Sequence, residues 1–178
     1  MPEVIFNGPE GRLEGRYHPS DNPQAPCALI LPPHPKAGGH MDHRITVAMY
    51  EQYKARGFSV LRFNFRGVGR SVGEYDNGQG ELQDAAYAMD YIQSFNQNAP
   101  FTWVSGYSFG AWIGMQLLMR RPEVSGFISM SLPTNTYDFS YEVHSEYAPY
   151  YSSGTTTYND VSIPVGSGTQ ILYFPITL

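Results

Sequence analysis

Runs of apolar residues separated by amphipathic segments divide the first 132 residues into predicted strands and helices. Two strand-like runs near the start flank a turn rich in glycine and proline, which predicts an opening hairpin from residues 4–6 and 12–17. Four further runs are predicted core strands, and the first of them is apolar without interruption, as expected of a strand buried on both faces. They cover residues 27–31, 58–65, 101–105 and 126–132.

The segments between these strands carry apolar residues at helical spacing, which predicts helices over 42–56, 81–95 and 110–121. In the first helix, Asp42 is the expected N-cap and Gly57 the terminator. One face of it is expected to carry Ile45, Ala48, Met49 and Gln52. The apolar stripe of the second comprises Leu82, Ala85, Ala86, Met89 and Ile92. The third is apolar on nearly every side, so we expect it to be the buried helix.

Strands and helices that alternate in this way predict an α/β fold with helices packed on a mostly parallel sheet. The chain has 178 residues, of which 42% are hydrophobic, so it can bury a sizeable core. This composition excludes a wholly disordered chain. We expect a single domain over residues 1–178.

The composition changes after Arg121, the last lysine or arginine of the chain. The 57 residues that follow contain five acidic residues, and 7 of the 14 tyrosines lie from Tyr137 onward. A stretch rich in serine, threonine and glycine predicts turns and short strands without a helix. We therefore expect a regular core over residues 1–140 and an atypical tail over 141–178.

Charge and cysteine content limit the partners and the compartment. A net charge of −5 argues against a nucleic-acid partner, because binding to phosphates needs clustered cations. Cys27 has no second cysteine with which to form an internal disulfide, and the N-terminal residues lack the basic and apolar regions of a signal peptide. No apolar run reaches the length of a membrane span. The expected location is the cytoplasm, without membrane insertion.

A pentapeptide between the third buried strand and the apolar helix carries the candidate chemistry. Residues 106–110 read Gly-Tyr-Ser-Phe-Gly and fit the G-x-S-x-G pattern of a nucleophile elbow, with Ser108 as the nucleophile. Small residues on both sides of such a serine let strand and helix approach closely, and the strained turn projects the hydroxyl. Because Ser108 precedes a helix, an oxyanion formed beside it lies near N–H groups and the positive end of the helix dipole.

The chain resembles the α/β-hydrolase superfamily, in particular the compact bacterial hydrolases related to dienelactone hydrolase. The resemblance covers residues 1 to about 140 and rests on four segments in the expected order: ILPPHPKAGG, FNFRGVGRSVGEYDNGQGE, GYSFGAWIGMQLLMRRPE and FISMSLPTNTYDFS. It implies a three-layer sandwich around a mostly parallel sheet, with C-terminal strands and helices that are lacking or altered here. It also implies a reaction without a metal or organic cofactor.

The same resemblance assigns roles to individual residues. The loop after the first buried strand supplies one oxyanion N–H, for which Lys36 is the better candidate because Pro35 has none. Phe109 supplies the second N–H, from the residue after the nucleophile. His34 and Tyr107 are expected to contact the substrate.

The rest of a catalytic triad has to come from the tail, because the family's chain order is serine, acid, histidine. No histidine follows His144, which is the nominated base although it comes directly after the fourth buried strand rather than near the C-terminus. Asp160 is the nominated acid, and Asp138 is the alternative.

Glycines at positions 67, 69 and 73 follow a strand, as they do in a dinucleotide-binding loop. The residues after them, EYDNGQG, do not begin a helix, which argues against that function. We interpret the segment as a loop beside the active site, in which Arg66 and Arg70 form ion pairs.

Two further groups of side chains were considered as a metal site and as a binding surface. Histidines 34, 40 and 43 with Asp42 have no zinc-like spacing, so we interpret them as solvated loop residues and expect no metal site. Tyrosines of the tail suit an aromatic binding surface or an interface between copies of the chain. They are Tyr141, Tyr147, Tyr150, Tyr151 and Tyr158.

Two functional hypotheses follow. In the first, the protein is a serine hydrolase that cleaves a small ester or related acyl compound through an acyl-enzyme on Ser108, without a cofactor. In the second, it is a non-catalytic or catalytically impaired α/β module whose tyrosine-rich tail pairs with another chain.

Overall fold

One seven-stranded sheet organises the part of the chain that the structure describes. The computed structural model describes residues 3–131, 133 and 136, together with the backbone of three short strands between residues 155 and 175. The strand order in the sheet is β1-β2-β4-β3-β5-β6-β9. These strands are β1 (Glu3–Gly8), β2 (Gly11–His18), β3 (Cys27–Leu31), β4 (Ser59–Phe63), β5 (Thr102–Tyr107), β6 (Val124–Met130) and β9 (Ile171–Pro175). The other two strands, β7 (Thr155–Tyr158) and β8 (Val161–Pro164), pair with each other.

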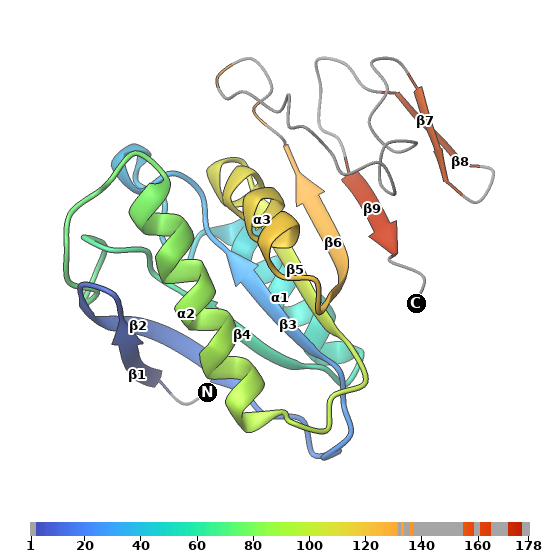
Figure 1. Cartoon of the computed structure of the whole chain (residues 1–178), viewed down its shortest axis with the longest axis horizontal. Helices are drawn as coiled ribbons and strands as arrows, with labels where there is room; N and C mark the ends of the chain where they lie inside the picture. The colour runs from blue at the N-terminus through green and yellow to red at the C-terminus, as the bar shows by residue number, and fades with distance from the viewer. Residues whose placement is uncertain are drawn as a thin grey trace.

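Helices cover both faces of this sheet (Figure 1). Helix α1 (Arg44–Ala55) lies on one face, and α2 (Gln79–Phe95) and α3 (Phe109–Arg120) lie on the other. The central strands β4, β3, β5 and β6 are parallel, whereas the β1–β2 hairpin and β9 join antiparallel. The predicted fold class is therefore confirmed: an α/β sandwich of three layers around a mostly parallel sheet.

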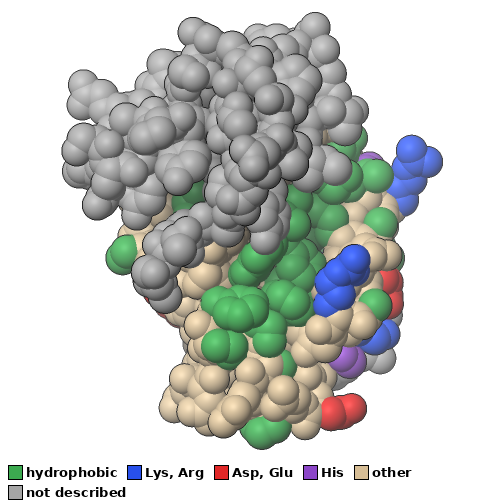
Figure 2. Space-filling model, turned by 90° about the vertical axis from the view of Figure 1, so that its right-hand side faces the viewer, with side chains coloured by type: hydrophobic (Ala, Val, Ile, Leu, Met, Phe, Trp, Pro, Cys, Tyr) green, Lys and Arg blue, Asp and Glu red, His purple; other side chains and the backbone are tan. Residues whose placement is uncertain are grey.

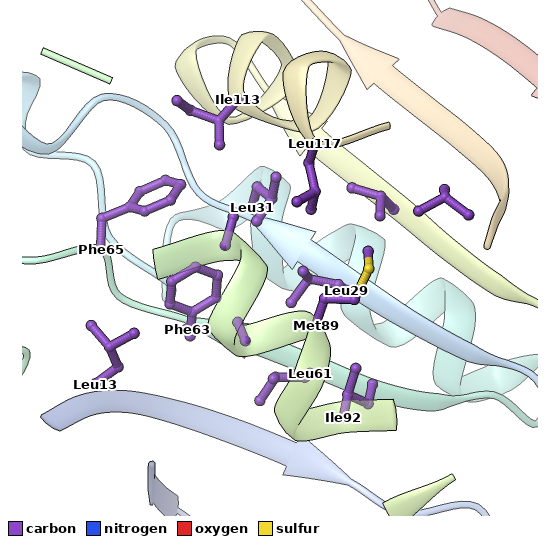
Figure 3. Close-up of a cluster of buried hydrophobic side chains, with 14 of the residues drawn as sticks. Leu13, Leu29, Leu31, Leu61, Phe63, Phe65, Met89, Ile92, Ile113 and Leu117 are labelled. Atoms are coloured by element: carbon purple, nitrogen blue, oxygen red, sulfur yellow. The ribbon is translucent and has the colours of Figure 1, made fainter. Parts of the chain in front are cut away.

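The core has two parts because β3 is buried on both faces. Leu29 and Leu31 pack with α2 and α3 in the larger cluster, whereas Ala28 and Ile30 pack under α1. Figure 3 shows the larger cluster, in which leucines of β3 and β4 meet Met89 of α2 and residues of α3. All five residues of β3 are fully buried, as its unbroken apolar run predicts.

The edge of the molecule at the right of Figure 1 is less completely covered. Ile128 and Met130 of β6 pack against the core cluster under α1 but are only partly buried. Phe101, just before β5, is 38% exposed. Seen from this side, apolar side chains gather on the surface (Figure 2). No helix in the described part of the chain is long and apolar enough to cross a membrane.

Helix α1 differs from its prediction at its start. His43, not Asp42, is the N-cap, and its Nδ1 accepts the Ile45 N–H at 3.3 Å. The carboxylate of Asp42 instead pairs with the guanidinium of Arg62 on β4. An ion pair with a buried arginine outcompetes capping, which a neighbouring imidazole can supply.

The predicted face of α1 was also wrong by one residue. Ala48 and Gln52 are exposed, and the buried positions are Thr46, Met49, Tyr50 and Tyr53. Two tyrosine rings bury more apolar area than the side chains of Ala48 and Gln52, and this difference rotates the helix on the sheet.

The predicted start of α2 was late, because an acidic side chain caps the helix. Glu81 is fully buried, and its carboxylate accepts the N–H groups of Asp76 at 2.9 Å and of Gly78 at 2.8 Å. This is one half of a capping box, in which the Glu81 carboxylate accepts the N–H of the N-cap Gly78, and the helix starts at Gln79. The start of α3 and the ends of β6 differ from prediction by one or two residues, as element ends often do.

Candidate active site

The turn between β5 and α3 is strained at Ser108. Its backbone has φ 54° and ψ −114°, in a region that residues other than glycine rarely adopt. Ser108 is the N-cap of α3, but its side chain does not cap the helix, although serine commonly does so at that position. The Ser108 N–H donates to the Met130 carbonyl at 2.9 Å, which ties the turn to the end of β6. Ser108 as a whole is half-buried.

The two glycines of the pentapeptide are required by close backbone contacts. A Cβ on Gly106 would lie 2.2 Å from the Gly110 carbonyl oxygen. A Cβ on Gly110 would lie 2.3 Å from the Leu31 carbonyl oxygen and 2.5 Å from that of Pro32. Strand β5, the end of β3 and the start of α3 therefore meet at backbone distance, as the sequence pattern predicts.

Replacing Gly110 with alanine should disrupt this junction. We expect the free energy of unfolding to fall by about 2–3 kcal/mol, because the new methyl group meets two backbone carbonyls that cannot rotate away. Urea denaturation measures the change. Gly57→Ala is a reference: a Cβ there meets nothing within 4 Å, although its φ of +80° adds backbone strain. A smaller loss for Gly110→Ala than for Gly57→Ala would contradict the argument.

The loop after β3 lies against this junction. It continues into a short 3-10 helix, η1 (Pro35–Ala37), whose N-cap is His34. The His34 Nδ1 accepts the Lys36 N–H at 3.1 Å, so Lys36 already has an acceptor in the free protein. The His34 ring lies 4.8 Å from the ring of Phe109, measured between centroids. The structure thus brings His34, Lys36 and Phe109 to one end of the sheet.

Phe109 fixes the start of α3 in the core. Its side chain is fully buried and contacts the rings of Phe65 and Trp112, each at 5.6 Å between centroids. Its peptide follows Ser108 at the N-terminal end of the helix, where the helix dipole favours negative charge. Burial of this ring therefore anchors the backbone next to the candidate nucleophile.

Tyr107, the last residue of β5, packs on the α1 side of the core. Its ring stacks on that of His43 with a centroid distance of 5.1 Å and an interplanar angle of 16°. Both side chains are half-buried. The stack connects the start of α1 to the last residue of β5, so aromatic surface borders the turn on this side.

The histidines of these loops face their own backbone. Each Nδ1 accepts the N–H of the residue two positions later, from His34 to Lys36, from His40 to Asp42 and from His43 to Ile45. Rings that accept in this way do not converge on a common point. Among the residues that the structure describes, no group of three or more histidine, cysteine or acidic side chains could hold a metal ion.

Burial lowers the pKa of two of these imidazoles below their ordinary value of 6.5. For His34 the charge of Lys36 adds to the effect and Glu81 opposes it. For His43 the neighbours His40 and Arg44 add to it. The lowered pKa favours the neutral form of each ring, which suits its role as a hydrogen-bond acceptor.

These shifts predict how stability depends on pH. A lowered pKa means that the folded protein binds the proton less tightly than the unfolded chain, so stability is lost as pH falls through about 6.5. We expect the double variant His34→Asn and His43→Asn to lose less unfolding free energy than the wild type between about pH 7.5 and pH 5.5. Urea denaturation at both pH values checks this, and parallel losses in the two proteins would contradict it.

The loop between β4 and α2 is held by buried charges. Burial alone would lower the pKa of Arg66, but hydrogen bonds to Asp84 raise it, so the guanidinium stays charged. Asp84 accepts from the Arg66 backbone N–H at 2.9 Å as well as from its side chain. Glu14 accepts the Arg70 N–H at 2.8 Å and lies where a Cβ on Gly69 would be. The expectation of an ion-paired loop is confirmed, with Arg70 bound to Glu3.

This loop carries Tyr75, to which the sequence pattern assigns no role. Its hydroxyl oxygen lies 3.1 Å from His34 Nε2, and the Lys36 ammonium lies 4.8 Å from the centre of its ring. Nothing in the spacing of the chain indicates this contact, because 41 residues separate Tyr75 from His34.

The nominated base and acids lie outside the described residues. The residues concerned are His144, Asp138 and Asp160, and the structure describes none of them. The tail tyrosines also lie outside the described residues, except that the backbone of Tyr158 belongs to β7. The described residues therefore establish the surroundings of Ser108 on the side of α3 and of the loops after β3 and β4.

Comparison with known proteins places this geometry in a family. The family model described as alpha/beta hydrolase fold matches residues 37–160. An uncharacterized protein of Rickettsia prowazekii is 51% identical over 144 residues, which are 79% of this chain and 60% of that protein.

Solved structures of α/β hydrolases are also similar to this chain. A protein of unknown function from Agrobacterium tumefaciens is 60% identical, with a TM-score of 0.76 over 78% of this chain and 64% of that one. An α/β serine hydrolase without a lid from Xanthomonas campestris is 27% identical, with a TM-score of 0.71 over 78% of this chain and 64% of that one. The chain thus spans about three fifths of the length of the relatives that it matches. The three-layer sandwich and the strained turn at Ser108 are consistent with these matches. The chain belongs to the α/β-hydrolase fold family.

Proposed function

We propose that this hydrolase-family chain acts as a serine hydrolase on a small ester or related acyl compound. One observation carries the proposal: Ser108 occupies a strained turn and N-caps a helix without using its hydroxyl as the cap. Strain of about 1–3 kcal/mol at one residue persists where the surrounding structure holds it, which is typical of functional sites. The turn thus acts as a nucleophile elbow.

In the proposed reaction, the Ser108 oxygen attacks the acyl carbonyl carbon and its proton passes to a base. The ester C–O bond then breaks, and the alcohol leaves with the proton. Water hydrolyses the acyl-serine by the same route in reverse and regenerates the hydroxyl. His144 as base and Asp160 or Asp138 as acid remain our nominees.

The peptide N–H groups of Phe109 and Lys36 are proposed to bind the oxyanion. Phe109 follows the nucleophile at the start of α3, and Lys36 follows the loop that packs against this start. The Lys36 N–H donates to the neutral His34 ring at 3.1 Å. An oxyanion is a stronger acceptor than a neutral imidazole, so it can share or replace that hydrogen bond. His34 and Tyr107 are proposed to contact the substrate.

A fluorophosphonate probe tests this function. The activated oxygen of Ser108 should form a bond to phosphorus and release fluoride, and mass spectrometry of the digested protein should find the adduct on Ser108. Ser131→Ala is the matched control, because Ser131 also follows a strand and also has a positive φ, of 51°. Labelling should persist in Ser131→Ala and vanish in Ser108→Ala. An unlabelled wild-type protein would instead favour the non-catalytic module.

A further inference from the structure

His34 connects the candidate oxyanion site to a residue on another loop. Its Nδ1 accepts the Lys36 N–H, which requires that this nitrogen carry no proton. In the neutral ring the proton therefore lies on Nε2. That nitrogen is 3.1 Å from the hydroxyl oxygen of Tyr75, so the imidazole donates and the phenol oxygen accepts.

The His34 ring is also confined on two sides. Its centroid lies 4.9 Å from the ring of Tyr75 and 4.8 Å from the ring of Phe109. Phe109 is fully buried and anchors the start of α3, so it does not yield easily. The ring contacts limit where the imidazole lies, and the two hydrogen bonds decide which nitrogen faces Lys36.

Tyr75 itself is held in place by the residues around it. Glu81 accepts the N–H groups of Asp76 and Gly78, which fixes the chain just after Tyr75. The Lys36 ammonium lies over the tyrosine ring at 4.8 Å from its centre, in the range of a cation–π contact. Tyr75 therefore contacts both the His34 ring and the Lys36 side chain, one through its hydroxyl and one through its ring.

We propose that Tyr75 is a positioning residue of the oxyanion site. Its hydroxyl accepts the Nε2 proton of His34, keeps the imidazole in the tautomer whose Nδ1 accepts the Lys36 N–H, and thereby fixes the orientation of the Lys36 peptide. This inference rests on the proposed function. It assigns to Tyr75 no contact with the reacting atoms: partners of this kind act by fixing the tautomer and orientation of a ring that other groups use.

The variant Tyr75→Phe removes only the hydroxyl and keeps the ring that contacts His34 and Lys36. We expect the rate constant for phosphonylation of Ser108 to fall roughly 3- to 10-fold, the effect of one neutral hydrogen bond. In ¹⁵N NMR spectra, the His34 ring should change from a single Nε2–H tautomer to a mixture. Tyr87→Phe is the matched control, because Tyr87 is 45% exposed on α2, and it should leave both the rate and the spectrum unchanged.

A second background separates positioning from a general structural effect. In His34→Asn, the amide oxygen can accept the Lys36 N–H without any choice of tautomer. Adding Tyr75→Phe to His34→Asn should therefore change the rate less than about 1.5-fold, which a double-mutant cycle measures. An equal loss in both backgrounds, or no loss in either, would overturn the inference while Ser108 is still labelled. A wild-type protein that is not labelled at Ser108 would overturn the proposed function first.

Discussion

Replacing Ser108 with alanine is expected to lower the rate of ester hydrolysis by at least about 10³-fold, equivalent to roughly 4 kcal/mol of transition-state stabilisation. Without the oxygen no acyl-enzyme forms, and only the oxyanion N–H groups and substrate binding remain to assist attack by water. Hydrolysis of a chromogenic short-chain ester, followed over the full substrate range, measures the loss. It should appear in kcat, with KM little changed.

Two further variants make this result specific. Ser108→Gly removes the same oxygen but adopts a positive φ without strain, so it should be equally inactive and more stable by about 1 kcal/mol. Among the described residues, Ser131 is the other serine with a positive φ, and Ser131→Ala should keep its activity. A Ser108→Gly protein that still turns over the ester at the wild-type rate would remove Ser108 from the mechanism.

Replacing Asp84 with alanine should have the largest effect on stability. Asp84 is fully buried, and its carboxylate accepts both the side chain and the backbone N–H of Arg66, which is itself 4% exposed. Removing one partner leaves a buried guanidinium without its main counter-charge, at a cost of about 3–5 kcal/mol. Because small domains are stable by only about 5–15 kcal/mol, this loss brings the protein close to unfolding at ordinary temperature.

The same helix supplies the matched control. Asp90 also pairs with an arginine, Arg121, at 2.6 Å, but its side chain is 62% exposed. An exposed pair contributes about 0–1 kcal/mol, so Asp90→Ala should change the midpoint of urea denaturation only slightly. Equal losses for Asp84→Ala and Asp90→Ala would show that burial of the first pair does not determine its contribution.

Elements with strong local patterns were predictable from the sequence. The unbroken apolar run of β3 and the all-round apolar surface of α3 appear as a doubly buried strand and a buried helix. Weaker patterns misled the prediction: the α1 face was one residue off, because neither Thr46 nor the tyrosines of α1 stand out in a count of aliphatic residues. Side-chain volume and an ion pair to β4 decided the orientation of this helix and its cap.

In the candidate site too, some residues were predictable from local sequence patterns and others were not. The pentapeptide around Ser108 was recognisable because the tight contacts of Gly106 and Gly110 demand glycine at fixed positions. The His34 ring contacts the Phe109 ring and accepts the Lys36 N–H, and the roles that the resemblance implies for these residues stay a prediction. Glu81 and Asp84 could not be found from spacing alone, because a buried acid on a helix resembles an exposed one until the packing is known. Tyr75 could not be found either, because its contact with His34 joins two loops that are far apart in the sequence.

The sequence by itself determined the alternation of strands and helices, the place of the sharp turn and the identity of the serine on it. These features depend on neighbouring residues, whose apolar periodicity and glycine content are visible along the chain. Only the tertiary structure decided which hydroxyl meets His34 Nε2, which carboxylate neutralises Arg66 and which ring lies against His34. Those contacts join residues from different loops and helices, and their free energies depend on burial and on distances that arise only once the sheet and helices have packed.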